Sequence, residues 1–126
     1  MRLVDTSAWI EWLIGSPVGI TVGAELPDRE QWVVPTIVQL ELAKWLTREA
    51  GEDKADRVIA FTETCFVVDL DTSIALAAAA LCARHRLATA DAIVYATALA
   101  QGADLLTCDR HFKGLANVRF TPKLAG

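Results

Sequence analysis

Residues 2–14, RLVDTSAWIEWLI, decide the fold of this chain. A short apolar strand ends at Asp5, and a pattern typical of a helix follows over residues 7–14 until the GSP sequence at residues 15–17 stops it. A buried-type strand that leads directly into a helix is the unit from which α/β domains with parallel sheets are built. The segment therefore predicts such a domain, with an acidic residue where the first strand ends.

The same alternation of strands and helices continues along the chain. Further strands are expected at residues 32–34, 66–68, 105–107 and 118–120. Further helices are expected at residues 18–26, 36–50, 52–64, 72–87 and 89–101. Thr89 is the expected N-cap of the last helix. No internal repeat, low-complexity tract or linker interrupts the pattern, so we expect a single domain over residues 1–126.

The composition is strongly apolar for a chain of 126 residues, with 53% hydrophobic residues and a mean hydropathy of +0.32. No apolar run approaches the roughly 18 residues of a membrane span, and Asp5 interrupts the N-terminal segment before it could form a signal peptide. We expect a cytoplasmic protein without a membrane partner, whose surplus apolar surface is covered by a second copy or another protein. The net charge of −4 argues only weakly against nucleic acid, because a metal ion could neutralise several of the acids.

The cysteines and histidines do not form a zinc-binding pattern. Cys65, Cys82 and Cys108 contain no CxxC motif, and His85 and His111 have no zinc-ligand spacing with them. We interpret the cysteines as small buried side chains in a reducing compartment.

Four acidic residues lie beside apolar sequence, where a carboxylate is costly to place: Asp5, Glu41, Asp91 and Asp109. Asp5 and Asp109 follow strands, and open parallel sheets bind ligands outside the carboxyl ends of their strands. Glu41 projects from the apolar face of the 36–50 helix, and Asp91 lies in the first turn of a helix that is apolar almost all round. Such carboxylates must be paired, protonated or bound to a cation. Together the four predict a pocket for a divalent metal.

Each of these acids also has a purely structural interpretation. Asp5 could cap the helix that follows it, Asp91 could interact with a helix dipole, and Asp109 could stabilise a turn. Glu41 could pair with a basic residue further along its own helix. Three other acids are excluded from the pocket: Asp69, Asp71 and Asp104. The first two lead into the 72–87 helix and would cap it, and the third precedes a strand and so belongs at the opposite edge of the sheet.

Three strings along the chain resemble the motifs of PIN-domain ribonucleases: VDTSAWI at residues 4–10, TADAIVYATA at residues 89–98 and LTCDRHF at residues 106–112. Glu41 lies between the first two, in the helix after the second strand. The order and spacing match over essentially the full chain, and its small size most resembles the VapC-type toxins of prokaryotic toxin–antitoxin pairs. The resemblance implies a PIN-like α/β fold, in which helices flank a mostly parallel sheet of about five strands.

The same resemblance implies an endoribonuclease that depends on Mg²⁺ or Mn²⁺, ions that favour carboxylate oxygen ligands. Asp5 and Asp91 would be the metal ligands, and Glu41 and Asp109 would complete the catalytic cluster. Hydroxyl groups of Thr6 or Ser7, and of Thr107, would orient water or carboxylates near the site. The implied partners are an RNA substrate, a cognate antitoxin protein and a second copy in a homodimer.

Other function classes fit the sequence less well. A haloacid-dehalogenase-like phosphatase needs a second aspartate two residues after the first, where this chain has Ser7. A response-regulator receiver needs an acidic pair before the first strand, which is not evident here. The remaining alternative is a non-catalytic PIN-like module that only binds RNA or protein, and the retention of all four acids argues against it.

RNA would have to be held by local positive charge, because the total charge is negative. The candidate residues lie near the acids in sequence: Lys44, Arg48, Arg84, Arg86, Arg110 and Lys113. Arg110 is preferred because it adjoins Asp109. Trp12 lies off the apolar face of the first helix and is expected either to form part of a partner surface or to pack under residues 15–30.

Overall fold

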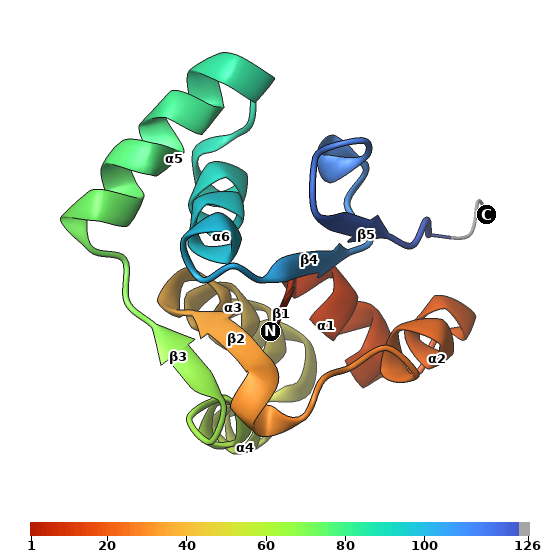
Figure 1. The fold of residues 1–126 in the computed structure, drawn as a ribbon. Coiled ribbons are helices and arrows are strands. Elements are labelled where there is room, and N and C mark those ends of the chain that lie inside the picture. The colour runs from red at the N-terminus through yellow and green to blue at the C-terminus, as the bar shows by residue number, and fades with distance from the viewer. Residues whose placement is uncertain (124–126) are drawn as a thin grey trace.

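The computed structural model describes residues 1–123, and within them five strands form one parallel sheet in the order β3-β2-β1-β4-β5 (Figure 1). The strands are β1 (Arg2–Val4), β2 (Trp32–Pro35), β3 (Phe66–Val68), β4 (Asp104–Thr107) and β5 (Val118–Phe120). The central strand β1 pairs with β2 on one side and β4 on the other, and its Leu3 and Val4 are fully buried. Because all pairings are parallel, the carboxyl ends of the strands meet at one edge.

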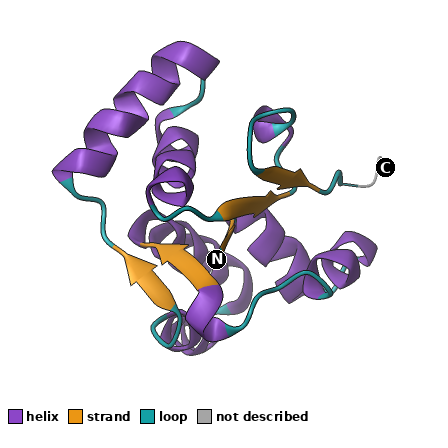
Figure 2. Cartoon of the chain, in the orientation of Figure 1, coloured by secondary structure: helices purple, strands orange, loops and turns teal. Residues whose placement is uncertain are grey.

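Helices connect the strands and pack against the sheet (Figure 2). They are α1 (Thr6–Ile14), α2 (Pro17–Gly23), α3 (Thr36–Ala50), α4 (Glu52–Thr62), α5 (Thr72–His85) and α6 (Thr89–Ala100), with single 3₁₀ turns at η1 (Arg29–Gln31) and η2 (Arg110–Phe112). α1 contacts β4, α3 contacts β2, and α6 contacts both strands, while α2, α4 and α5 pack on α1, α3 and α6 respectively. Within residues 1–123, no helix is both long and apolar enough to span a bilayer.

The expected strands are all present, and the expectation of a mostly parallel α/β sheet is confirmed. The expected N-cap role of Thr89 is wrong: Thr89 is the first residue of α6, and Ala88 occupies the cap position without a side-chain hydrogen bond. α5 ends at His85 because Arg86 adopts a left-handed conformation with φ of 55°, which a helix cannot continue.

The cysteines are all free, but they are not all buried as expected. Cys108 is buried, whereas Cys65 and Cys82 are only partly covered.

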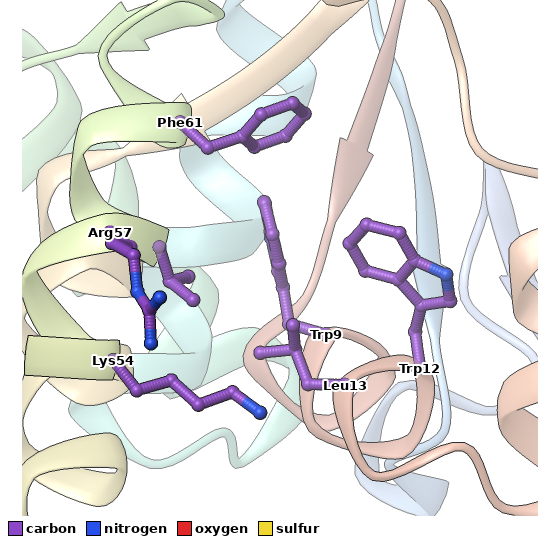
Figure 3. A pocket seen from close by; sticks show the side chains of 7 residues that line it. Trp9, Trp12, Leu13, Lys54, Arg57 and Phe61 are labelled. Atoms are coloured by element: carbon purple, nitrogen blue, oxygen red, sulfur yellow. The ribbon is translucent and has the colours of Figure 1, made fainter. Parts of the chain in front are cut away.

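An aromatic cluster fills the core between α1, β2 and α4. The buried rings of Trp9 and Trp32 lie with centroids 4.7 Å apart, and Phe61 packs edge-on against both. The ring of Trp9 lies between Trp12 and the side chains of α4 (Figure 3). Trp12 is half-buried and lies under α2, where a Cβ at Gly23 would be 3.3 Å from its ring. Packing under the following segment, one of the two expectations for Trp12, is therefore confirmed.

Candidate metal centre

At the carboxyl edge of the sheet, the four expected acids lie close enough for their charges to affect one another. Asp5 directly follows β1, Asp109 follows β4 by one intervening residue, and Glu41 and Asp91 project from α3 and α6. Burial is the largest cause of the raised pKa of Asp5 and of Asp91, and neighbouring charges add to it: those of Asp109 and Glu41 at Asp5, and those of Asp109, Asp5 and Glu41 at Asp91. Four elements far apart in sequence thus contribute one acidic cluster.

Asp5 is the buried member of this cluster, with 5% of its surface exposed. Its Oδ2 accepts hydrogen bonds from the Ser7 hydroxyl at 2.7 Å and the Thr107 hydroxyl at 2.8 Å. Burial raises the pKa of this carboxyl, and the two hydroxyl donors act against that effect. Asp5 occupies the N-cap position of α1, but its side chain makes no capping hydrogen bond, so the structural interpretation of this residue is wrong.

The two hydroxyls that hold Asp5 also hold the chain that follows β4. The Cys108 N–H donates to Ser7 Oγ at 3.0 Å, and the Asp109 N–H donates to Thr107 Oγ1 at 2.9 Å. Ser7 and Thr107 therefore tie the end of β1 to the segment that carries Asp109. The Cys108 thiol beside them stays neutral near pH 7, because burial raises its pKa to about 11.

Glu41 is positioned by a hydroxyl and not by a basic residue. The Thr6 hydroxyl donates to Glu41 Oε1 at 2.7 Å, which links α1 to α3. Arg48 pairs instead with Glu49 at 3.0 Å, and no ion pair of Glu41 occurs among residues 1–123. The alternative in which Glu41 pairs with a basic residue of its own helix is therefore wrong for the described part of the chain.

Asp91 and Asp109 share a neighbour that the sequence did not single out. His111 Nδ1 lies 3.0 Å from Asp109 Oδ1 and 3.7 Å from Asp91 Oδ2. Asp109 Oδ1 also accepts the His111 N–H at 2.9 Å, so Asp109 caps η2 as well as facing the cluster. Burial, followed by the charges of Asp109 and Asp5, raises the pKa of Asp91 to about 6. In the sequence, a role for His111 was indicated only by its position two residues after Asp109.

The donor set of the cluster fits a hard divalent cation. Its members are carboxylates, which Mg²⁺ and Mn²⁺ prefer, and one ligand atom each from Asp91, Asp109 and His111 lie within 4.8 Å of one another. Among residues 1–123, no lysine or arginine forms an ion pair with any of the four acids. The cluster therefore carries negative charge that no lysine or arginine ion pair offsets, and this charge adds to burial, the larger cause, in raising the pKa of Asp5 and Asp91.

The three acids that the sequence analysis excluded from the pocket lie outside the cluster or have another structural role. Asp104 receives two hydrogen bonds from the Arg2 guanidinium, both at 2.9 Å, at the amino ends of β1 and β4. Asp71 caps α5 by accepting the Ile74 N–H at 2.8 Å. Asp69 is exposed in the loop before that helix.

The fold and the acidic edge define a PIN-type α/β domain. The family model described as the PIN domain matches residues 2–118, and the chain therefore belongs to the PIN-domain family. No curated protein matches the chain in sequence.

Solved structures with the same fold come from several bacteria. A toxin–antitoxin complex from Klebsiella pneumoniae is similar with a TM-score of 0.81 and 23% identity, over 94% of this chain and 96% of that one. VapC20 of Mycobacterium tuberculosis, described as a toxin that cleaves the sarcin–ricin loop, gives a TM-score of 0.75 and 19% identity, over 92% and 95% of the chains. FitAcB from Neisseria gonorrhoeae gives a TM-score of 0.72 and 22% identity, over 97% and 98%. These likenesses establish the fold that the chain shares with them.

The raised pKa of Asp91 predicts an unusual pH dependence for the metal-free protein. Because this carboxyl binds its proton more tightly in the folded state, stability should increase as the pH falls through about 6. One pKa unit corresponds to about 1.4 kcal/mol, and solvent screens part of the effect, so we expect a gain of roughly 1 kcal/mol between pH 7.5 and 5.0, where this carboxyl is largely protonated. Urea unfolding in EDTA measures it. The depressed pKa values of Asp104 and Glu25 affect stability only at lower pH.

A matched pair of variants tests the assignment of this effect. Asp91→Asn should reduce the gain, whereas Asp69→Asn, which removes an exposed acid before α5, should leave it unchanged. Equal pH profiles for the two variants would show that Asp91 is not the responsible group.

Proposed function

We propose that this protein is a Mg²⁺- or Mn²⁺-dependent endoribonuclease and the toxin of a toxin–antitoxin pair. The observation that carries the proposal is the convergence of Asp5, Glu41, Asp91 and Asp109 at one sheet edge without a lysine or arginine counter-charge among residues 1–123. Membership of the PIN-domain family supports nuclease activity. The Mycobacterium tuberculosis toxin VapC20, which has the same fold and cleaves the sarcin–ricin loop, supports RNA as the substrate.

In this proposal Asp5 and Asp91 hold the metal, and Glu41 and Asp109 complete the catalytic cluster. When bound, a divalent cation stabilises charge that builds on the phosphate and makes water a better nucleophile near neutral pH. The protein's own contribution is to fix the carboxylates: Ser7 and Thr107 orient Asp5, and Thr6 orients Glu41. These hydroxyl contacts limit side-chain motion in the cluster, so that its oxygens need little rearrangement when the substrate arrives.

The direct test is cleavage of RNA. Purified protein incubated with total bacterial RNA and Mg²⁺ or Mn²⁺ should yield fragments with 5′-phosphates, detected by gel and by end mapping. EDTA should abolish cleavage, and Asp5→Asn should lower the rate by at least about 100-fold, because a positioned charged group at such a site contributes on that scale. Asp69→Asn is the matched control and should cleave normally. Cleavage that survives both EDTA and Asp5→Asn would contradict the proposal, and no cleavage under any condition would favour the non-catalytic PIN-like module.

Metal binding can be measured without activity. Mg²⁺ or Mn²⁺ should raise the melting temperature, because a ligand that binds only the folded state stabilises it by mass action and here also relieves repulsion between carboxylates. The gain should shrink in Asp91→Asn and persist in Asp69→Asn. The same gain in wild type and Asp91→Asn would place the metal elsewhere.

A cleft between α1 and α4 supports a protein partner such as the antitoxin. It has a volume of about 240 Å³ and a mostly apolar lining of Trp9, Trp12, Leu13, Val58 and Phe61, with Lys54 and Arg57 beside them (Figure 3). Both charged residues are cations, although the whole chain is acidic. An acidic segment with an apolar anchor residue would complement this cleft. Similar solved structures include toxin–antitoxin complexes, in agreement with such a partner.

Self-association is the second expected protein contact. Large apolar side chains stay exposed on three neighbouring helices, with Leu40 of α3 at 58%, Leu76 of α5 at 68% and Leu99 of α6 at 41% exposure. They support the proposal of a homodimer, which sedimentation equilibrium of the purified chain would test: a strictly monomeric protein at micromolar concentration would contradict it.

Toxicity is tested in cells. Expression without an antitoxin should arrest bacterial growth, and Asp5→Asn should relieve the arrest at equal protein level. Asp69→Asn should remain as toxic as the wild type. Growth arrest of equal strength with Asp5→Asn would separate toxicity from the acidic cluster.

A further inference from the structure

A polar pocket of about 310 Å³ adjoins the acidic cluster on the side of β5. It is lined by Ser7, Cys108, Asp109, Arg110, Pro122 and Lys123. Ser7 and Asp109 belong to the cluster itself, so the pocket lies directly beside the carboxylates. The four acids of the cluster do not explain why a pocket with two cations lies beside them.

The register of the sheet places the two cations of this pocket together. β4 and β5 pair in parallel with Thr107 opposite Phe120, and the Thr121 N–H donates to the Thr107 carbonyl at 2.9 Å. Residues 121–123 therefore continue alongside the segment that follows β4, which brings Lys123 to the pocket that Arg110 enters from η2. Twelve residues separate Arg110 and Lys123 in sequence, and the pairing of β4 with β5 brings them together.

Both cations are free to take an anion. Arg110 and Lys123 are exposed, and neither forms a hydrogen bond or an ion pair within residues 1–123. The Ser7 hydroxyl is occupied, since it donates to Asp5 and accepts the Cys108 N–H. The remaining charged group, the Asp109 carboxylate, repels an anion and would direct it to the cationic side of the pocket.

Several other basic residues near the acids in sequence are less suited to this role. Arg48 pairs with Glu49, and the Lys113 ammonium lies 5.9 Å from the centre of the Phe120 ring. Arg84 lies in a mostly apolar hollow between α5 and α6. The sequence-based preference for Arg110 thus agrees with its position, and Lys123 is a residue that the sequence did not indicate.

We propose that this pocket binds a phosphodiester of the RNA strand next to the one that is cleaved, with Arg110 and Lys123 as positioning residues. The proposal rests on RNA being the substrate, as proposed above. A polyanion approaching a cluster of four carboxylates in a protein of net charge −4 needs local cations to hold it. Arg110 offers a planar fork for two phosphate oxygens, and Lys123 offers a point charge. Because phosphate contacts carry no sequence information, the pocket sets the strand's position and not its specificity.

The test compares two double variants of equal charge change. Arg110→Gln/Lys123→Gln removes the cations of the pocket, and Arg84→Gln/Lys54→Gln removes the same charges far from it. Binding of a fluorescent single-stranded RNA is measured by anisotropy in the Asp5→Asn background with Mg²⁺, over a series of salt concentrations. The pocket variant should bind about tenfold more weakly, and its slope of log K against log salt should fall by about 1.4, since each phosphate contact on a single strand contributes about 0.7.

Kinetics of the otherwise wild-type enzyme give the second measurement. The pocket variant should raise KM by about the same factor while kcat changes less than about threefold, because these residues hold the strand and do not touch the reacting atoms. Lys123→Arg should retain wild-type KM. Melting temperatures verify that all variants fold, and binding is repeated with wild-type residue 5 in EDTA in case Asp5→Asn is unstable.

The possible outcomes separate this proposal from the proposed function. If the protein cleaves RNA and both double variants have the same affinity, salt slope and KM, the pocket does not hold the strand. If the pocket variant alone loses affinity but the wild type cleaves no RNA, the pocket assignment stands and the nuclease proposal fails.

Discussion

The buried carboxylate of Asp5 is the group on which the candidate site depends. It lies at the end of the central strand, where a charge can be kept only if hydrogen-bond donors and a cation replace the water it has lost. Ser7 and Thr107 supply the donors, and the oxygens of the same hydroxyls accept the N–H groups of Cys108 and Asp109. The orientation of Asp5 and the placement of Asp109 thus depend on the same hydrogen-bond network.

The two edges of the sheet show the same side-chain type in opposite surroundings. At the amino edge, Asp104 is held by the Arg2 guanidinium, whose hydrogen bonds lower its pKa. At the carboxyl edge, burial and neighbouring acids raise the pKa of Asp5 and Asp91. The fold can therefore place a basic partner beside a carboxylate at the amino edge of the sheet. At the carboxyl edge, Asp5 and Asp91 have no lysine or arginine partner among residues 1–123. An arrangement chosen for stability alone would pair these acids, so their placement is better explained by a ligand of positive charge.

Much of this architecture could be predicted from local sequence. Each strand is a short apolar run bounded by helical patterns, and parallel topology alone brings strand-end acids such as Asp5 and Asp109 to one edge. A helical wheel indicated the face on which Glu41 lies, but it could not identify Thr6 as the partner, because that contact depends on how α1 and α3 pack. His111 and Lys123 were missed for related reasons. The first is directed by a single 3₁₀ turn that leaves no periodic pattern, and the second depends on the register of β4 and β5.

Helix α1 takes part in both surfaces of the protein that the proposals concern. Its first turn supplies Thr6 and Ser7 to the acidic cluster, and its later residues Trp9, Trp12 and Leu13 line the apolar cleft. A helix of 9 residues is only about 13 Å long at 1.5 Å per residue. Trp9 is also packed against Trp32 of β2 in the core, so the helix is held at its middle. A partner bound in the cleft would therefore contact the same helix that orients Asp5 and Glu41. On that helix, the residues that line the cleft begin within about one turn of the residues that hold the two acids.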